Sequence, residues 1–203
     1  MSRPADSAWG VVHVSHHTFY LVDDGVFPQP PFAPKNGLVL VQPGVAVIFT
    51  GASSGVVTVG VQVRQDPPDA AGIEGWDEVI EVSLEAMAGS VTVATPMADA
   101  PDLPVLTSTG PGHYRIRVHA RGRDTAPDVV AFEPSEEYLL TAWPGQPAPE
   151  AVYRQTDQYG AGLRSTTFQQ TGQPELTAHS EAKRRPSLEA NLRRAASRFQ
   201  KGH

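Results

Sequence analysis

The sequence contains no cysteine among its 203 residues, which excludes disulfide bonds and every site that needs a thiolate. It also lacks any apolar run of roughly 18 residues, the length that a membrane-spanning helix requires. The opening residues, MSRPADSAWG, have neither the basic nor the apolar region of a signal peptide. We therefore expect a cytoplasmic protein that does not insert stably into a membrane.

Basic residues are scarce in most of the chain and concentrated at its end. Residues 1–180 carry nine Lys and Arg against twenty Asp and Glu, whereas residues 181–203 carry seven against two. An acidic body argues against binding nucleic acid through its phosphates, so nucleic acid is expected as a partner of the tail only. The 18 Gly and 19 Pro residues favour short elements joined by turns.

Alternation of apolar and polar residues predicts a mainly β protein. The clearest example is the run in which Val57, Val59, Val61 and Val63 share one face of a strand. A strand is also predicted over residues 9–22, and similar segments recur as far as Trp143. Eight or nine such segments with turn signals between them indicate an antiparallel β-sandwich or open barrel.

Composition changes after this region and suggests three parts. We predict a β domain over residues 9–145, a flexible linker over the polar residues 146–180, and a basic amphipathic helix over residues 181–203. The apolar stripe of the helix consists of Leu188, Leu192, Ala195 and Phe199. The arginines beside the stripe are Arg193, Arg194 and Arg198. Such a helix could fold back on the acidic body or bind an external partner, including DNA or an anionic membrane.

Three histidines near the N-terminus invite a metal-site interpretation. On a strand, His13 and His17 would lie about 13 Å apart and His16 would face the other side. Zinc needs its ligand nitrogens at about 2.0–2.1 Å, so these residues cannot close a site by themselves. We predict neither a metal site nor a cofactor.

The motif GASSG at residues 51–55 fits the pattern of a hydrolase nucleophile elbow, with Ser53 as the nucleophile. That elbow joins a strand to a helix, whereas here a valine-rich strand follows at once. Glycine and serine are also typical of tight turns. We therefore interpret the motif as a hairpin turn and predict no catalytic residue.

A polar row with period two precedes the turn-like RGRD at residues 121–124. Its members are His113, Arg115, Arg117, His119 and Arg121, and Arg123 follows in the turn. A row of cations on a rigid strand could grip an acidic partner. The alternative is a solvated sheet face that a neighbouring strand neutralises with Asp77, Glu81 and Glu85.

Several segments, in this order, resemble those of the competence protein J-like family: VHVSHHTFYLVD, GASSGVVTVGVQV, WDEVIEVSLEA, GPGHYRIRVHARGRD and EEYLLTAWP. The sequence also resembles small uncharacterised actinobacterial proteins. The first resemblance covers residues 9–144 and implies a β module that binds a protein, such as an inhibitor or immunity protein of a nuclease.

The sequence thus predicts a non-catalytic protein-binding module, an inhibitor or immunity protein whose partner acts on nucleic acid and has a basic surface. The predicted partner-binding residues are Arg115, Arg117, Arg121, Arg123, Leu188, Leu192, Arg193, Arg194, Arg198 and Phe199. Two alternatives remain open. One is a small enzyme that uses a histidine and a carboxylate in a sheet-lined cleft, and the other is a regulator whose basic helix engages DNA or membrane.

Overall fold

The computed structural model describes residues 4, 6–69, 72–95 and 101–171, with side chains described as far as residue 166. The chain divides into two compact units, Met1–Thr167 and Phe168–His203. Most of the second unit lies outside the described residues, and so does the helix predicted over residues 181–203. The predicted partner-binding residues in that part are Leu188, Leu192, Arg193, Arg194, Arg198 and Phe199.

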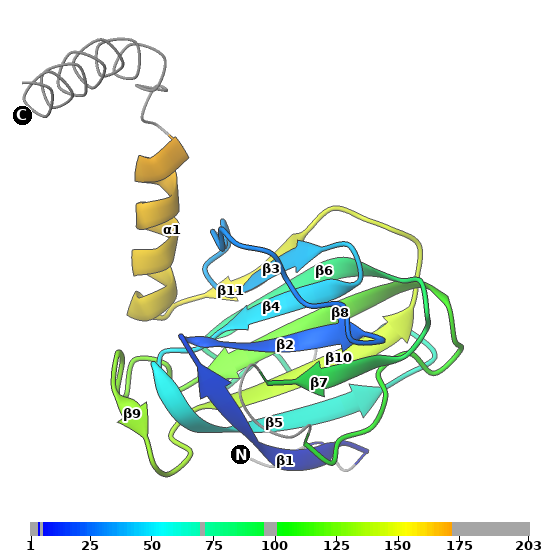
Figure 1. Cartoon of the computed structure of the whole chain (residues 1–203), viewed down its shortest axis with the longest axis horizontal. Coiled ribbons are helices and arrows are strands. Elements are labelled where there is room, and N and C mark those ends of the chain that lie inside the picture. Colours follow the sequence, from blue (N-terminus) through cyan, green and yellow to red (C-terminus); the bar gives the residue numbers. More distant parts are fainter. Residues whose placement is uncertain (1–3, 5, 70–71, 96–100, 172–203) are drawn as a thin grey trace, which may run out of the picture. The chain divides into compact units, whose positions relative to one another are not determined.

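Eleven strands and one helix form the regular structure of the described residues (Figure 1). The strands are β1 (Ala8–Ser15), β2 (Thr18–Asp23), β3 (Val39–Gln42), β4 (Val45–Phe49), β5 (Ser54–Val63), β6 (Glu78–Ala86), β7 (Val91–Ala94), β8 (Gly112–Arg121), β9 (Val130–Ala131), β10 (Glu137–Pro144) and β11 (Ala151–Gln155). The helix α1 spans Gln158–Thr171. The prediction of a mainly β protein is confirmed.

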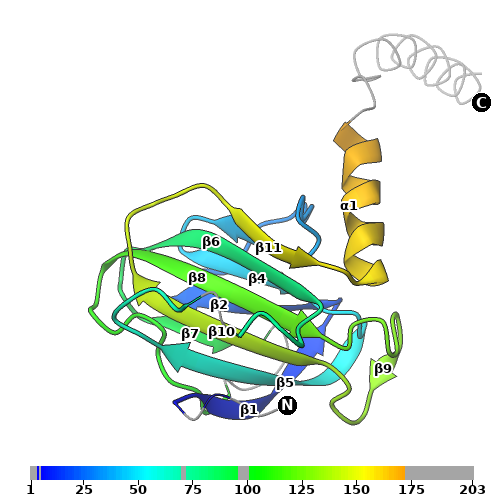
Figure 2. The same ribbon diagram turned by 180° about the vertical axis from the view of Figure 1, so that it is seen from behind.

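The strands form one curled sheet that makes a half-barrel (Figures 1 and 2). Its larger part has the order β11-β6-β8-β10-β5-β1, and its smaller part consists of β3, β4, β2 and β7. The two parts are joined at the β1–β2 hairpin, where Ser15 pairs with Thr18 before the strands separate. This agrees with the predicted open barrel. The sheet is mixed, however, because β5 runs parallel to both β9 and β10.

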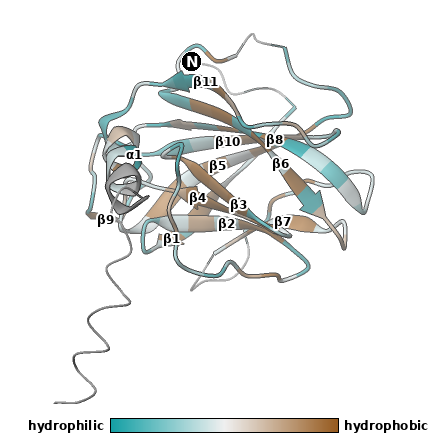
Figure 3. Cartoon of the chain, turned by 90° about the horizontal axis from the view of Figure 1, so that it is seen from above, coloured by the Kyte–Doolittle hydropathy of each residue, from teal (hydrophilic) through white to brown (hydrophobic). Residues whose placement is uncertain are grey.

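The core lies on the inner face of the curled sheet, where alternate residues meet. Val57, Val59 and Val61 of β5 are buried there, as their alternation predicts, together with Phe19 of β2 and Ile48 of β4. Figure 3 shows hydrophobic residues concentrated on the strands of the smaller part of the sheet, whereas strands of the larger part also carry hydrophilic stretches. Each buried side chain of this kind contributes roughly 1.5–3 kcal/mol, so a one-residue slip of register would be costly.

The single strand predicted over residues 9–22 is wrong, because two strands occupy this region. His16 and His17 form the turn between β1 and β2, with φ angles of 52° and 60°. A two-residue hairpin turn of this type needs positive φ at both central positions, which Asn-Gly or Asp-Gly usually provides. Neither pair is present here, so the sequence carries no turn signal at this point.

The flexible linker predicted over residues 146–180 is also wrong for much of the part that the structure describes. Strand β11 pairs antiparallel with β6, with Ala151 opposite Glu81. Helix α1 follows, and Asp157 caps it by accepting the N–H of Gly160 through Oδ1 at 2.9 Å. The β unit therefore continues past residue 145. An edge strand with exposed side chains has a polar composition, which is why this segment looks like a linker. No helix among the described residues is both long enough and apolar enough to cross a membrane.

Candidate functional site

The arginine row of β8 lies on the outer face of the larger part of the sheet, but much of it is covered. Arg115 and Arg117 are only 6% and 4% exposed. Arg115 Nη2 donates to Glu81 Oε1 at 2.8 Å, and Arg117 Nη2 donates to Glu81 Oε2 at 3.0 Å. Neutralisation by Glu81 on the neighbouring strand was expected. The expected solvent exposure of Arg115 and Arg117 is wrong.

The cover over these two arginines comes from the segment predicted as a linker. Arg115 Nη1 donates to the Ala148 carbonyl at 2.8 Å, and the Arg117 guanidinium lies 4.5 Å from the centre of the Tyr153 ring. Burial by itself would raise the pKa of Glu81, but the hydrogen bonds from Arg115 and Arg117 outweigh it and hold that pKa below its ordinary value. The cluster is therefore a closed ion-pair site within the fold.

Arg121 lies further along the row and keeps some exposed surface. It forms an ion pair with Glu137 of β10, and its guanidinium lies 4.8 Å from the centre of the Trp76 ring. Of the other two acidic residues expected to neutralise the row, Asp77 accepts a backbone N–H and Glu85 is exposed. Arg121 is thus the arginine of the row best placed to meet a partner.

Arg123 has no exposed surface, and treating it as a surface residue is wrong. Its Nε donates to Asp157 Oδ2 at 2.6 Å, and its Nη1 donates to the Gly37 carbonyl at 2.8 Å. Burial would lower the pKa of Arg123, but Tyr138 and Asp157 together raise it above its ordinary value. Asp157 was not among the predicted site residues, because it lies in the segment predicted as a linker.

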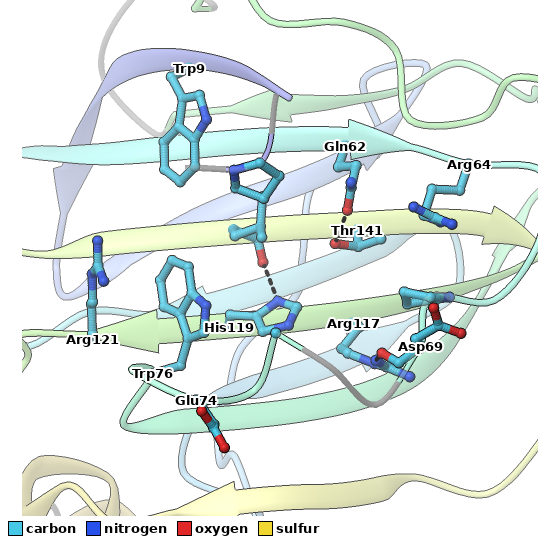
Figure 4. A pocket seen from close by; sticks show the side chains of 14 residues that line it. Trp9, Gln62, Arg64, Asp69, Glu74, Trp76, Arg117, His119, Arg121 and Thr141 are labelled. Atoms are coloured by element: carbon cyan, nitrogen blue, oxygen red, sulfur yellow. Dashed lines mark hydrogen bonds between the residues drawn. The ribbon is translucent and has the colours of Figure 1, made fainter. Parts of the chain in front are cut away.

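A pocket of about 500 Å³ opens on the same outer face (Figure 4). Residues that line it include Trp9, Gln62, Trp76, His119, Leu139 and Thr141. His119 Nδ1 lies 3.1 Å from the Leu139 carbonyl oxygen, so this nitrogen carries the proton and donates it. Burial lowers the pKa of His119 to about 4, against the effect of that hydrogen bond. The enzyme alternative requires a carboxylate that accepts a hydrogen bond from the histidine. His119 donates to a backbone carbonyl instead, so it does not form that arrangement.

The three N-terminal histidines have different surroundings. His13 lies on β1, whereas His16 and His17 form the β1–β2 turn. His17 Nδ1 is 3.0 Å from the Tyr159 hydroxyl, and its Nε2 is 3.5 Å from the Asp128 carboxylate. Among the residues that the structure describes, no group of three or more His, Asp and Glu side chains is arranged to hold a metal ion.

The GASSG motif does not form the predicted hairpin turn. It joins β4 to β5, and these strands are separated in the sheet by β1 and β2. The motif instead holds residues 124–136, which we call the β9 segment (Figures 1 and 2). Ser53 N–H donates to the Val129 carbonyl at 2.9 Å, and a Cβ on Gly55 would lie 2.0 Å from the Ala131 carbonyl oxygen. Only glycine allows this close approach.

A buried carboxylate completes the attachment of the β9 segment. The side chain of Glu136 accepts the N–H groups of Gly51 and Ala52 at 3.0 and 2.5 Å, and it also accepts the Tyr138 hydroxyl. Burial, followed by the charge of Glu136, raises the pKa of Tyr138 well above its ordinary value, so the hydroxyl stays protonated. The glycine and serine residues of the motif therefore hold the β9 segment in place. The sequence pattern of a hairpin turn does not indicate this role.

The β9 segment presents apolar side chains to solvent. Phe132 is 89% exposed, and Val129 and Val130 are 46% and 51% exposed. The exposed carboxylates of the segment belong to Asp124, Asp128 and Glu133, and residues 124–136 contain no Lys or Arg. The fold is thus a β half-barrel that carries a firmly attached, acidic segment with an apolar centre.

Two solved structures are similar to this chain. One is ComJ, inhibitor of the DNA degrading activity of NucA, from Bacillus subtilis, with 11% identity over 68% of this chain and 96% of that chain and a TM-score of 0.47. The other is described as crocagin biosynthetic gene J, with 16% identity over 69% and 97% and a TM-score of 0.43. The first of these similarities agrees with the resemblance noted in the sequence, at a low identity and a low TM-score. No protein-family model and no curated protein sequence matches the chain.

Proposed function

We propose that this protein is a non-catalytic binding module that inhibits an enzyme acting on nucleic acid, and that the β9 segment contacts the enzyme. The observation that carries the proposal is Phe132, which is 89% exposed on a backbone held by the hydrogen bonds of residues 51–53. Exposed aromatic side chains are common centres of binding energy in protein interfaces. A backbone that is already ordered loses little further conformational entropy on binding.

The charge of the β9 segment indicates the kind of partner. Asp124, Asp128 and Glu133 flank the exposed apolar residues in sequence and carry the same sign. A complementary partner would place Lys or Arg around an apolar depression that accepts Phe132. Enzymes that act on nucleic acid present such cations to phosphates, so the acidic segment would occupy the surface that the nucleic acid needs.

Of the predicted contact residues on β8 and in the turn after it, only Arg121 belongs to the proposed interface. Arg121 retains surface near the end of the β9 segment and is a proposed contact at its edge. Arg115, Arg117 and Arg123 hold the fold together through Glu81 and Asp157, so we do not place them in the interface. The tail residues named above remain predictions, because they lie outside the described residues.

Photo-crosslinking from the β9 segment tests the proposal. A photoreactive phenylalanine analogue replaces Phe132 in the full chain, and in a matched control it replaces Met87, which is 74% exposed on a different loop. We expect a basic protein to crosslink in cells of the source from position 132 and not from position 87. The same product from both positions, or none from position 132, would contradict the proposed contact.

The purified partner then allows two measurements. Replacement of Phe132 by Ser should weaken binding by about 30-fold or more, the effect of losing an interface centre of ~2 kcal/mol, whereas Met87→Ser should leave the Kd unchanged. The double change Asp128→Asn and Glu133→Gln should slow association and reduce its dependence on salt. Saturating amounts of the protein should stop nucleic-acid cleavage by the partner. Undiminished cleavage would refute inhibition even where binding is confirmed.

A further inference from the structure

The pocket over the larger part of the sheet has an apolar wall and one unused polar atom. Trp76 is 8% exposed and packs with Leu139 on the outer face, with Trp9 beside them. Gly60 of β5 lies under Trp9, because a Cβ at this position would be only 2.7 Å from the Trp9 ring. The absence of a side chain at Gly60 thus sets the position of the Trp9 ring at the pocket.

His119 supplies the unused atom. Because its Nδ1–H donates to the Leu139 carbonyl, its Nε2 carries a lone pair and can only accept a hydrogen bond. Within the described residues Nε2 makes no hydrogen bond, although the side chain is only 5% exposed. Figure 4 shows the His119 ring between Trp76 and Arg117 on the pocket floor. Among the described residues, Arg123 Nη2 is the one buried polar side-chain atom without a partner, so His119 Nε2 is open to solvent in the pocket. A ligand that donates to Nε2 could take the place of water there.

The three arginines that line the pocket already have partners of opposite sign, whereas the lining carboxylates of Asp69 and Glu74 are exposed to solvent. Arg117 is paired with Glu81 and Arg121 with Glu137. Arg64 lies 3.8 Å from the Asp6 carboxylate. An anionic ligand would have to displace one of these pairs, whereas a neutral ligand would leave them intact.

We propose that this pocket binds a small neutral aromatic molecule that carries one O–H or N–H donor. The aromatic ring would contact the indole rings of Trp9 and Trp76, and the donor would bind His119 Nε2. Pockets for small molecules typically combine such an apolar wall with one or a few polar groups that fix the orientation of the ligand. Except for Arg121, which borders both, this site is separate from the residues that we propose to contact a protein partner, and it can be tested without that partner.

Matched pairs of probes test the donor directly on the full chain. Phenol is compared with anisole, and indole with N-methylindole, because each pair has a similar shape and differs in the donor. Binding is followed by calorimetry and by the Nε2 resonance of protein that contains isotope-labelled histidine. We expect phenol or indole to bind roughly tenfold more tightly than its methylated counterpart, as one buried hydrogen bond would give. The His119 Nε2 resonance should move only with the donor-bearing probe.

His119→Phe provides the matched variant, because it keeps a ring and removes the acceptor. In this variant the two members of each pair should bind equally. The proposal is overturned if neither donor-bearing probe binds the wild-type chain more tightly than its methylated counterpart. It is also overturned if the Trp76 indole N–H resonance reports binding while the Nε2 resonance stays unchanged. Both of these measurements use the wild-type protein, so they hold even where the variant does not fold.

Discussion

Arg123 Nε lies 2.6 Å from Asp157 Oδ2, and neither side chain is more than 1% exposed. The pair joins the turn after β8 to the start of α1, two positions 34 residues apart in the sequence. The Asp157 carboxylate also accepts the Gly160 N–H through its other oxygen. One carboxylate thus both neutralises a buried cation and caps a helix.

Replacement of Asp157 by Ala should lower the free energy of unfolding by about 3–5 kcal/mol, because it leaves the buried Arg123 charge without a counter-ion. Chemical denaturation at pH 7 measures the change. Asp102→Ala is the control, since Asp102 is exposed, and it should change the free energy by less than about 0.5 kcal/mol. Equal effects from the two variants would show that the buried pair is not needed.

Truncation tests where the folded unit ends. A chain of residues 1–145 lacks β11, α1 and Asp157, so it exposes the edge of β6 and leaves Arg123 unpaired. We expect it to unfold at a much lower temperature than a chain of residues 1–171, and with poorer cooperativity. Thermal unfolding followed by near-ultraviolet circular dichroism compares the two. A fully stable 1–145 chain would restore the boundary predicted from the sequence.

The pH dependence of the free energy of unfolding should show that His119 is buried in its neutral form. Burial lowers its pKa to about 4 in the folded state, below the ordinary value of 6.5, so the unfolded chain takes up the proton first. This contribution is fully present above pH 6.5 and is lost as the pH falls toward 4, by about 3 kcal/mol in total. Glu78 changes the free energy of unfolding in the opposite direction. Burial and then the Asp157 charge raise its pKa to about 7, so its contribution to stability falls as the pH rises from 4.5 to 7.

Comparison with a variant therefore isolates the histidine. His119→Gln should flatten the decline in unfolding free energy between pH 6.5 and 4, whereas His113→Gln, at an exposed position of the same strand, should not. An unchanged slope in the His119 variant would mean that its imidazole is not buried in the neutral form.

Gly60 should tolerate no side chain. A Cβ would lie 2.7 Å from Cε2 of the Trp9 ring, so Gly60→Ala should displace that ring and cost about 1–3 kcal/mol of stability. Tryptophan fluorescence should shift to longer wavelength as the indole gains contact with water. Gly10→Ala on the adjacent strand is the control, because its Cβ would lie at an ordinary 3.4 Å from Leu103. A fluorescence spectrum unchanged by Gly60→Ala would contradict the packing of Trp9.

Local patterns predicted much of the fold. The alternation of valines on β5 predicted that Val57, Val59 and Val61 share one face of a strand, and the structure places all three in the core. Period-two burial depends on residues two positions apart, so it is visible in the sequence itself. The same rule put Arg115 and Arg117 on the outer face, which is where they lie.

The sequence by itself therefore determined the mainly β class and which residues face the core. Tertiary structure alone decided that Arg115, Arg117 and Arg123 are buried, because the segments that cover and neutralise them come from elsewhere in the chain. It also decided that the GASSG motif holds the β9 segment rather than turning a hairpin. Burial of a charge and attachment of a loop depend on contacts between residues far apart in sequence, and no local period records such contacts.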